Sequence, residues 1–77
     1  MIDYSRLWQI LDERFMLPYD LITNKVVAGQ TFSRLRKNRN INTSSVNDIC
    51  KFLQIQPGDF MRYIPDEEAN EAEEDEE

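Results

Sequence analysis

The sequence predicts a small all-α domain, a compact bundle of five short helices. Apolar residues recur at intervals of three and four in separate short stretches, the spacing that places them on one side of a helix. Proline residues or asparagine-rich loops separate most of these stretches. We expect one domain over residues 1–65. A body of this size needs nearly every large apolar side chain in its core.

The first predicted helix follows Asp3, a favourable N-cap residue. Its core face carries Tyr4, Leu7, Trp8, Leu11 and Phe15. Core packing is the better interpretation of Trp8, although an exposed recognition aromatic would be compatible with the same local sequence. A second helix of about two turns begins at Pro18, a residue that suits the first helical position, and runs through residues 19–24.

The third predicted helix covers residues 29–36, and an asparagine-rich loop follows it. Thr43 or Ser44 caps a fourth helix, whose apolar residues are Val46, Ile49, Cys50, Phe52 and Leu53. We interpret Cys50 as a small buried hydrophobe rather than a reactive thiol. Pro57 opens a fifth helix through Phe60, Met61 and Ile64, which Pro65 ends. The predicted core consists of Leu7, Leu11, Leu21, Phe32, Leu35, Ile49 and Leu53.

Charge divides the chain into two unlike parts. The net charge of the whole chain is −6, but nine of its fifteen acidic residues lie in residues 66–77. Residues 1–65 carry the other six acidic residues and all nine basic residues, a net charge of +3. The acidic segment has too little apolar surface to order itself, so we expect a disordered tail there. A run of like charges is usually a solvated tail.

Composition excludes several classes of function. The chain has no histidine and a single cysteine, so the usual zinc sites and an intramolecular disulfide are out of reach, and no cofactor is implied. We find no activated nucleophile and no glycine-rich phosphate loop, and therefore do not expect an enzyme. The first residues have neither a basic start nor a long apolar run. We accordingly expect a cytoplasmic protein without a membrane span.

The third predicted helix is the most informative stretch. Between Leu21 and Asn47 there is no acidic residue, while five basic residues fall there: Lys25, Arg34, Arg36, Lys37 and Arg39. With Phe32 and Leu35 facing inward, small, amide and guanidinium side chains are left on the outer face. Such a helix can enter a DNA major groove. A solvated basic helix on an ordinary small domain is the alternative interpretation.

Several short sequence stretches, in their order and spacing, resemble those of the Cro/C1-type (XRE-family) helix-turn-helix regulators of bacteria and phages. They are Tyr4-Ser-Arg-Leu-Trp, Tyr19-Asp-Leu-Ile, Thr31-Phe-Ser-Arg-Leu-Arg-Lys-Asn, Asp48-Ile-Cys-Lys-Phe-Leu and Gln56-Pro-Gly-Asp-Phe-Met-Arg-Tyr-Ile. The resemblance covers residues 4–64. It implies a lambda-repressor-like fold with the helix-turn-helix at the second and third helices. It also implies binding to double-stranded DNA.

The resemblance also implies roles for individual residues. The base-reading positions fall on Gly29, Gln30, Ser33 and Arg34. The phosphate-contacting positions fall on Thr31, Arg36, Lys37, Asn38 and Arg39. Of these, Arg34 has the chemistry to bind guanine and Gln30 to bind adenine, each through two hydrogen bonds. Affinity carried by phosphate contacts falls as salt concentration rises.

Two positions depart from the family pattern. Val26 occupies the place of the glycine that many members have in the turn between the second and third helices. We therefore expect either a remodelled turn that uses Asn24 or Gly29, or an extended Lys25-Val26. Leu17-Pro18 stands where many members carry a Gln, Ser or Thr that touches a phosphate, and no side chain here offers that contact.

A single domain of this type touches few base pairs, so we expect a homodimer on a pseudo-palindromic site. Candidate dimer residues are Phe60, Met61, Tyr63 and Ile64. Alternatively, Phe60 and Ile64 close the core while Met61 and Tyr63 are singly exposed. A rival function keeps the same fold but binds a protein partner, as an antirepressor or antitoxin does, with the acidic tail imitating DNA.

Overall fold

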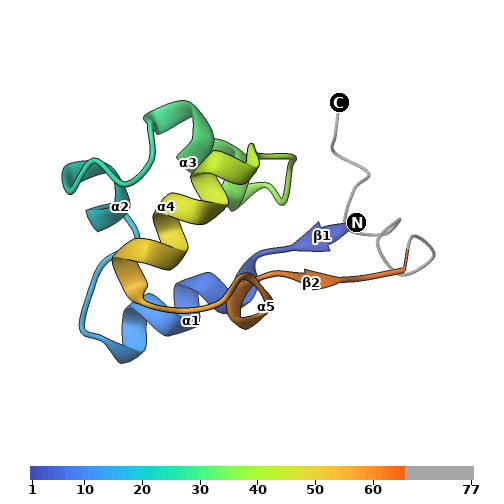
Figure 1. The fold of residues 1–77 in the computed structure, drawn as a ribbon, viewed down its shortest axis with the longest axis horizontal. Coiled ribbons are helices and arrows are strands. Elements are labelled where there is room, and N and C mark those ends of the chain that lie inside the picture. The colour runs from blue at the N-terminus through green and yellow to red at the C-terminus, as the bar shows by residue number, and fades with distance from the viewer. Residues whose placement is uncertain (66–77) are drawn as a thin grey trace.

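A computed structural model describes residues 1–65, and the predicted disorder of residues 66–77 lies outside the described residues. Five helices follow one another, as predicted, and a two-stranded sheet joins the two ends of the described chain (Figure 1). The helices are α1 (Ser5–Glu13), α2 (Asp20–Thr23), α3 (Gly29–Arg36), α4 (Thr43–Leu53) and α5 (Pro57–Phe60). The strands are β1 (Ile2–Asp3) and β2 (Arg62–Tyr63). No described helix is long and apolar enough to cross a membrane.

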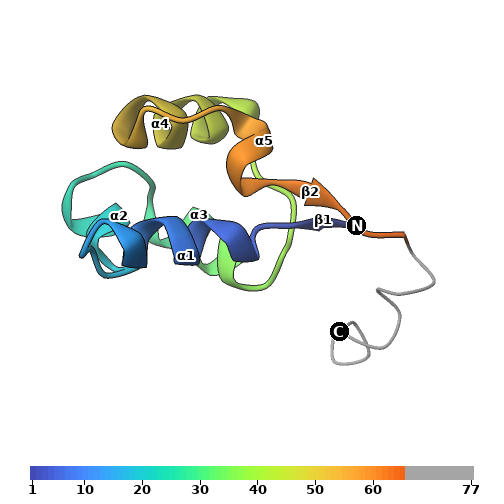
Figure 2. The same cartoon turned by 90° about the horizontal axis from the view of Figure 1, so that it is seen from below.

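The core lies between two layers, with α4 packed over a layer formed by α1, α2 and α3 (Figure 2). Six of the seven predicted core residues are fully buried there: Leu7, Leu11, Leu21, Leu35, Ile49 and Leu53. The seventh, Phe32, is half-buried and packs against the edge of the core. Phe60 of α5 is also fully buried and belongs to the same core.

The expected fifth helix through Ile64 is wrong, because α5 ends at Phe60 and the chain continues in an extended conformation. β2 pairs with β1 in an antiparallel register, with Ile2 opposite Tyr63. The backbone N–H of Ile64 donates to the carbonyl of Met1 at 2.8 Å and extends the pairing. Ile64 also precedes Pro65, and a residue before proline is disfavoured in the helical conformation. A sheet of two-residue strands therefore replaces the last predicted turn.

The starts of three helices differ from the predicted ones by one or two residues. The N-cap of α1 is Tyr4, and Asp3 lies in β1, from where its carboxylate still accepts the Ser5 N–H at 3.3 Å. Asn42, and neither Thr43 nor Ser44, is the N-cap of α4. Pro18 lies in a turn before α2, which begins at Asp20.

Four of the helices end in the same way, with a residue in the left-handed conformation that sends the chain sharply away. These residues are Phe15, Lys25, Asn38 and Gln54. In α1, the N–H of Met16 then donates to the carbonyl of Leu11 at 2.9 Å. Glycine usually occupies such a position because other residues are strained there. Neither glycine of this chain has a positive φ.

Phe15 is the clearest correction to the predicted core. Its spacing after Leu11 continues the apolar side of α1, yet its side chain is 98% exposed. The reason is that α1 ends at Glu13, and the left-handed turn at Phe15 rotates the side chain away from the core face. Its ring is thus not part of the core, while its backbone carries conformational strain.

Cys50 is half-buried and packs against the core. Burial, with a further contribution from the carboxylate of Asp59, raises the pKa of the Cys50 thiol. The thiolate is therefore disfavoured, and this cysteine is a poor nucleophile.

Replacing Phe15 with glycine should stabilise the domain. A left-handed conformation costs an ordinary residue about 1–2 kcal/mol, which glycine avoids. Glycine also loses more conformational entropy on folding, which offsets about 0.5–1 kcal/mol of this gain. We therefore expect Phe15→Gly to raise the free energy of unfolding by about 0.5–1 kcal/mol in urea denaturation. Phe15→Ala is the matched control, since it removes the ring but keeps the strain. A loss of stability in Phe15→Gly would show that the exposed ring stabilises the fold.

Replacing Leu35 with alanine should unfold much of the domain, because this side chain is fully buried and its loss leaves a cavity. We expect a cost of about 2–5 kcal/mol, measured by thermal denaturation. Ser33→Ala, at an exposed position of the same helix, is the control. An unchanged melting temperature for Leu35→Ala would contradict the observed packing of α3.

Candidate nucleic-acid interface

The turn between α2 and α3 forms without a glycine. The turn is remodelled, the first of the two predicted alternatives, but Lys25 takes the left-handed conformation, with φ of 61°. The predicted use of Asn24 or Gly29 and the extended Lys25-Val26 are therefore wrong. The backbone N–H groups of Val26 and Val27 both donate to the carbonyl of Leu21, at 2.9 and 3.2 Å. This turn sets the direction in which α3 leaves α2.

Aromatic packing holds the inner side of α3. The ring of Phe32 meets Trp8 of α1 edge-on, with ring centroids 5.9 Å apart, and meets Tyr19 in the same manner at 6.1 Å. The guanidinium carbon of Arg36 lies 5.3 Å from the centre of the Trp8 ring. Cation–π attraction therefore restrains Arg36 at the edge of this aromatic cluster. Trp8 thus serves the packing of α3, in agreement with the preferred interpretation of its spacing.

The outer side of α3 presents the side chains that the sequence analysis assigned to base reading. Gln30, Ser33 and Arg34 are all exposed, and Gly29 is exposed at the first position of the helix. Thr31, an expected phosphate contact, is half-buried. Within residues 1–65, no hydrogen bond or ion pair engages the side chains of Gln30, Ser33 or Arg34. The fold brings them together on one helix and leaves their polar groups available.

Gly29 is not required by the backbone. Its φ is negative, and a Cβ added there would meet no atom within 4 Å. The fold would accept a side chain at this position. The absence of one therefore affects only the exposed surface of the first turn of α3. It lets a ligand approach the backbone closely.

The end of α3 is built around Asn38, which takes the left-handed conformation with φ of 56°. The N–H of Arg39 donates to the carbonyl of Arg34 at 2.8 Å, and the N–H of Asn38 to that of Leu35 at 3.3 Å. These are the two bonds of a Schellman motif. The amide side chain of Asn38 points toward β1 and bonds to Asp3 and Tyr4. The structure therefore shows a contact of the Asn38 side chain with β1 and the start of α1, and the expected phosphate contact stays a prediction.

An open hollow of about 490 Å³ lies beside the outer face of α3, between its last turns and the start of α4. Its lining residues are Arg34, Arg39, Asn40, Ile41 and Asn42. Sequence reasoning missed the last three, although the asparagine-rich composition of the loop was a signal for polar contacts. Two guanidinium groups and two amides make this hollow suitable for an anion or for polar base edges.

The stretch from Leu21 to Asn47, which includes α3 and the following loop, carries five basic residues and no acidic residue. Within the described chain, no carboxylate forms an ion pair with Arg34, Arg36 or Lys37. Their charge is thus not neutralised by acids of residues 1–65. Nowhere in that range do three acidic, cysteine or histidine side chains gather as a metal site would require.

The proposed dimer candidates are not equivalent. Phe60 is fully buried within the chain and cannot contact a partner, which corrects its assignment. Met61 and Ile64 are half-buried, whereas Tyr63 is 67% exposed. Ile2, the register partner of Tyr63 in the sheet, is also exposed.

Comparison with known proteins agrees with this geometry. The family model for the Cro/C1-type HTH DNA-binding domain matches residues 6–66. The chain is also similar to the transcriptional regulator VanUg, whose crystal structure superposes with a TM-score of 0.79 at 31% sequence identity, over 83% of this chain and 85% of that chain. No curated protein sequence matches it. The chain therefore belongs to the family of Cro/C1-type helix-turn-helix DNA-binding domains.

Proposed function

We propose that this DNA-binding regulator recognises a specific double-stranded sequence by placing α3 in the major groove. The observation that carries the proposal is the outer face of α3, where unpartnered polar side chains stand beside cations that no described acid neutralises. The major groove of B-DNA is wide enough for one helix, and its base edges offer the acceptors and donors that such side chains bind.

Base reading falls to Gln30 and Arg34 in this proposal. A glutamine amide matches the N6 and N7 atoms of adenine, and a guanidinium matches the O6 and N7 atoms of guanine. Gly29 lets the backbone approach the bases closely, and Ser33 adds a short hydroxyl at the same face. The open hollow beside Arg34 leaves its guanidinium room to turn toward the groove.

Phosphate contacts fall to the cations that flank this face. In this proposal Arg36, which lies over the Trp8 ring, and the exposed Lys37 and Arg39 neutralise phosphates on the side of the groove. The half-buried Thr31 adds its hydroxyl. Leu17 offers no polar side chain, and its backbone N–H already donates to the Asp20 carboxylate at 2.9 Å.

The rival proposal is a protein-interaction module that uses the fold and the acidic segment to bind a protein partner. A gel-shift assay with the DNA upstream of its own gene, at two salt concentrations, separates the two. DNA binding that weakens as salt rises supports the regulator. Failure of the wild-type protein to bind that DNA or random-sequence DNA supports the interaction module.

We further propose a homodimer, with the exposed Tyr63 and Ile2 of the sheet in the contact. Two copies would read half-sites about one helical turn apart on a pseudo-palindromic site. Sedimentation velocity should then give a dimer for the wild-type protein and a shift toward monomer for Tyr63→Ser. A monomeric wild-type protein at assay concentrations, both free and on DNA, would contradict the dimer.

Substitutions of Arg34 and Lys37 should have different effects on binding. Arg34→Ala should cost about 1–3 kcal/mol of affinity and relax the sequence preference at one base pair. Lys37→Ala should weaken binding to all sequences about equally and reduce the slope of log affinity against log salt by about one. Both effects can be measured by fluorescence anisotropy with duplexes that differ at single base pairs.

Lys51→Ala is the control, because it removes the same charge from the last turn of α4. We expect it to leave affinity and specificity nearly unchanged. An unchanged base preference in Arg34→Ala would refute its role in base reading, even if the affinity falls.

A further inference from the structure

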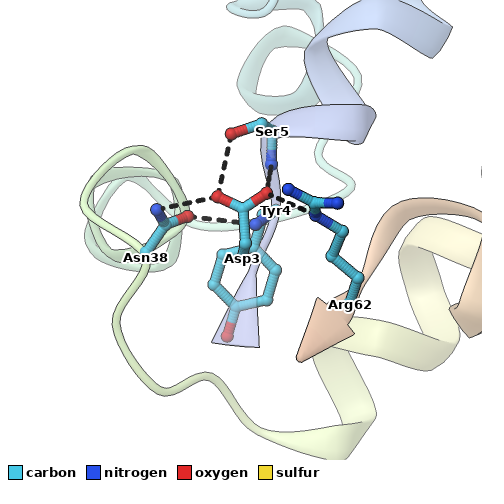
Figure 3. A network of polar contacts seen from close by, with 5 residues as sticks. All are labelled: Asp3, Tyr4, Ser5, Asn38 and Arg62. Atoms are coloured by element: carbon cyan, nitrogen blue, oxygen red, sulfur yellow. Dashed lines mark hydrogen bonds and ion pairs between the residues drawn. The ribbon is translucent and has the colours of Figure 1, made fainter. Parts of the chain in front are cut away.

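A buried carboxylate joins the two-stranded sheet to the start of α1 and to the turn after α3 (Figure 3). Asp3 is 7% exposed, and among the described residues it is the one buried charged side chain. Its Oδ1 accepts the Ser5 hydroxyl at 2.9 Å and the Asn38 amide NH₂ at 3.1 Å. Its Oδ2 accepts the Ser5 N–H at 3.3 Å and lies 3.7 Å from the Arg62 guanidinium of β2. A buried carboxylate needs such partners, since burial of an unpaired charge is costly.

Two consecutive residues near the start of the chain, Asp3 and Tyr4, bind the two residues that follow the C-cap of α3, Asn38 and Arg39. The amide of Asn38 donates to Asp3 and accepts the backbone N–H of Tyr4 at 3.0 Å, so both of its ends are used (Figure 3). The hydroxyl of Tyr4 donates to the carbonyl of Arg39 at 2.8 Å. Burial raises the pKa of Tyr4, so its hydroxyl remains a donor. We refer to these contacts of Asp3, Tyr4, Asn38 and Arg39 as the terminal clamp.

The side chain of Asn38 does more than the turn requires. Glycine would adopt the left-handed conformation at lower cost and would make the same two backbone bonds. What asparagine adds is the amide that reaches Asp3 and Tyr4. The amide is thus needed for the connection between α3 and β1, and β1 in turn is held by β2.

We propose that Asp3 and Asn38 are positioning residues for DNA binding. The clamp fixes the backbone from which Lys37 and Arg39 project, and it limits fraying of the last turn, which carries Arg36. Pairing of β1 with β2 is thereby coupled to the position of the phosphate-contacting cations. This inference rests on the proposed function, and it assigns a role in binding to a sheet that contributes none of the expected DNA contacts.

The test is a double-mutant cycle with the full chain. Asn38→Asp places a carboxylate against that of Asp3 and breaks the bond. Adding Asp3→Asn restores it with donor and acceptor exchanged, while the net charge equals that of the wild-type protein. Asn38→Gly keeps the left-handed backbone and removes only the amide, and Tyr4→Phe removes only the hydroxyl. Asp12→Asn, at an exposed position of α1, controls for the charge change of Asp3→Asn.

Affinity is measured by anisotropy for a duplex from the DNA upstream of its own gene and for a scrambled duplex, at two salt concentrations. Circular dichroism identifies a temperature at which each variant is folded. We expect Asn38→Gly to lose about tenfold in affinity, equivalent to about 1.4 kcal/mol, and to reduce the salt slope by about one. Asn38→Asp should lose more, and the double variant should return to within about threefold of the wild-type protein. Asp12→Asn should bind as the wild type does.

A purely structural clamp would lower the melting temperature of Asn38→Gly and leave the affinity and salt slope of the folded molecules unchanged. That result, or a double variant that binds no better than Asn38→Asp, would overturn the proposal. If Asn38→Asp does not fold, the DNA affinities of Asn38→Gly and Tyr4→Phe test the proposal. Wild-type affinity in both variants would overturn the proposal. Failure of the wild-type protein to bind either duplex would instead contradict the proposed function.

Discussion

Burial of one apolar side chain per short helix is the constraint on which the fold depends. Helices of four to eight residues are not stable alone in water. Leu21 is the fully buried residue of α2, Leu35 that of α3 and Phe60 that of α5. We refer to these three buried residues as anchors. Burial of its anchor in the core shared with α1 and α4 therefore stabilises each of these helices. In a domain this small, loss of one anchor removes much of the total stability.

The same constraint frees the surface that we assign to DNA. Because Leu35 and Phe32 hold α3 from one side, its outer face contributes little to the core and can carry polar and basic side chains. Repulsion among its cations is tolerated, since they are solvated or, for Arg36, placed over an aromatic ring. The left-handed residue Asn38 turns the chain sharply after α3, and its side chain there donates a hydrogen bond to Asp3 of β1.

Helical spacing was sufficient to predict five helices and most of the core, because these depend on local periodicity and on burial of apolar side chains. It could not predict the sheet, since β1 and β2 have two residues each and pair across about sixty residues. Phe15 was misplaced because periodicity does not show that a helix has ended. The contacts of Asn38 were missed for a related reason, because its partners Asp3 and Tyr4 are distant in sequence and only the fold brings them together.

We propose above all that α3 and the residues directly after it form the DNA-contacting surface. Titration of the ¹⁵N-labelled protein with the duplex from upstream of its gene, followed by backbone amide chemical shifts, tests this most directly. We expect the largest changes on Gly29–Arg39 and the hollow-lining residues 40–42, with small changes in the second half of α4. Largest changes on α4 or α5, with α3 unaffected, would contradict it.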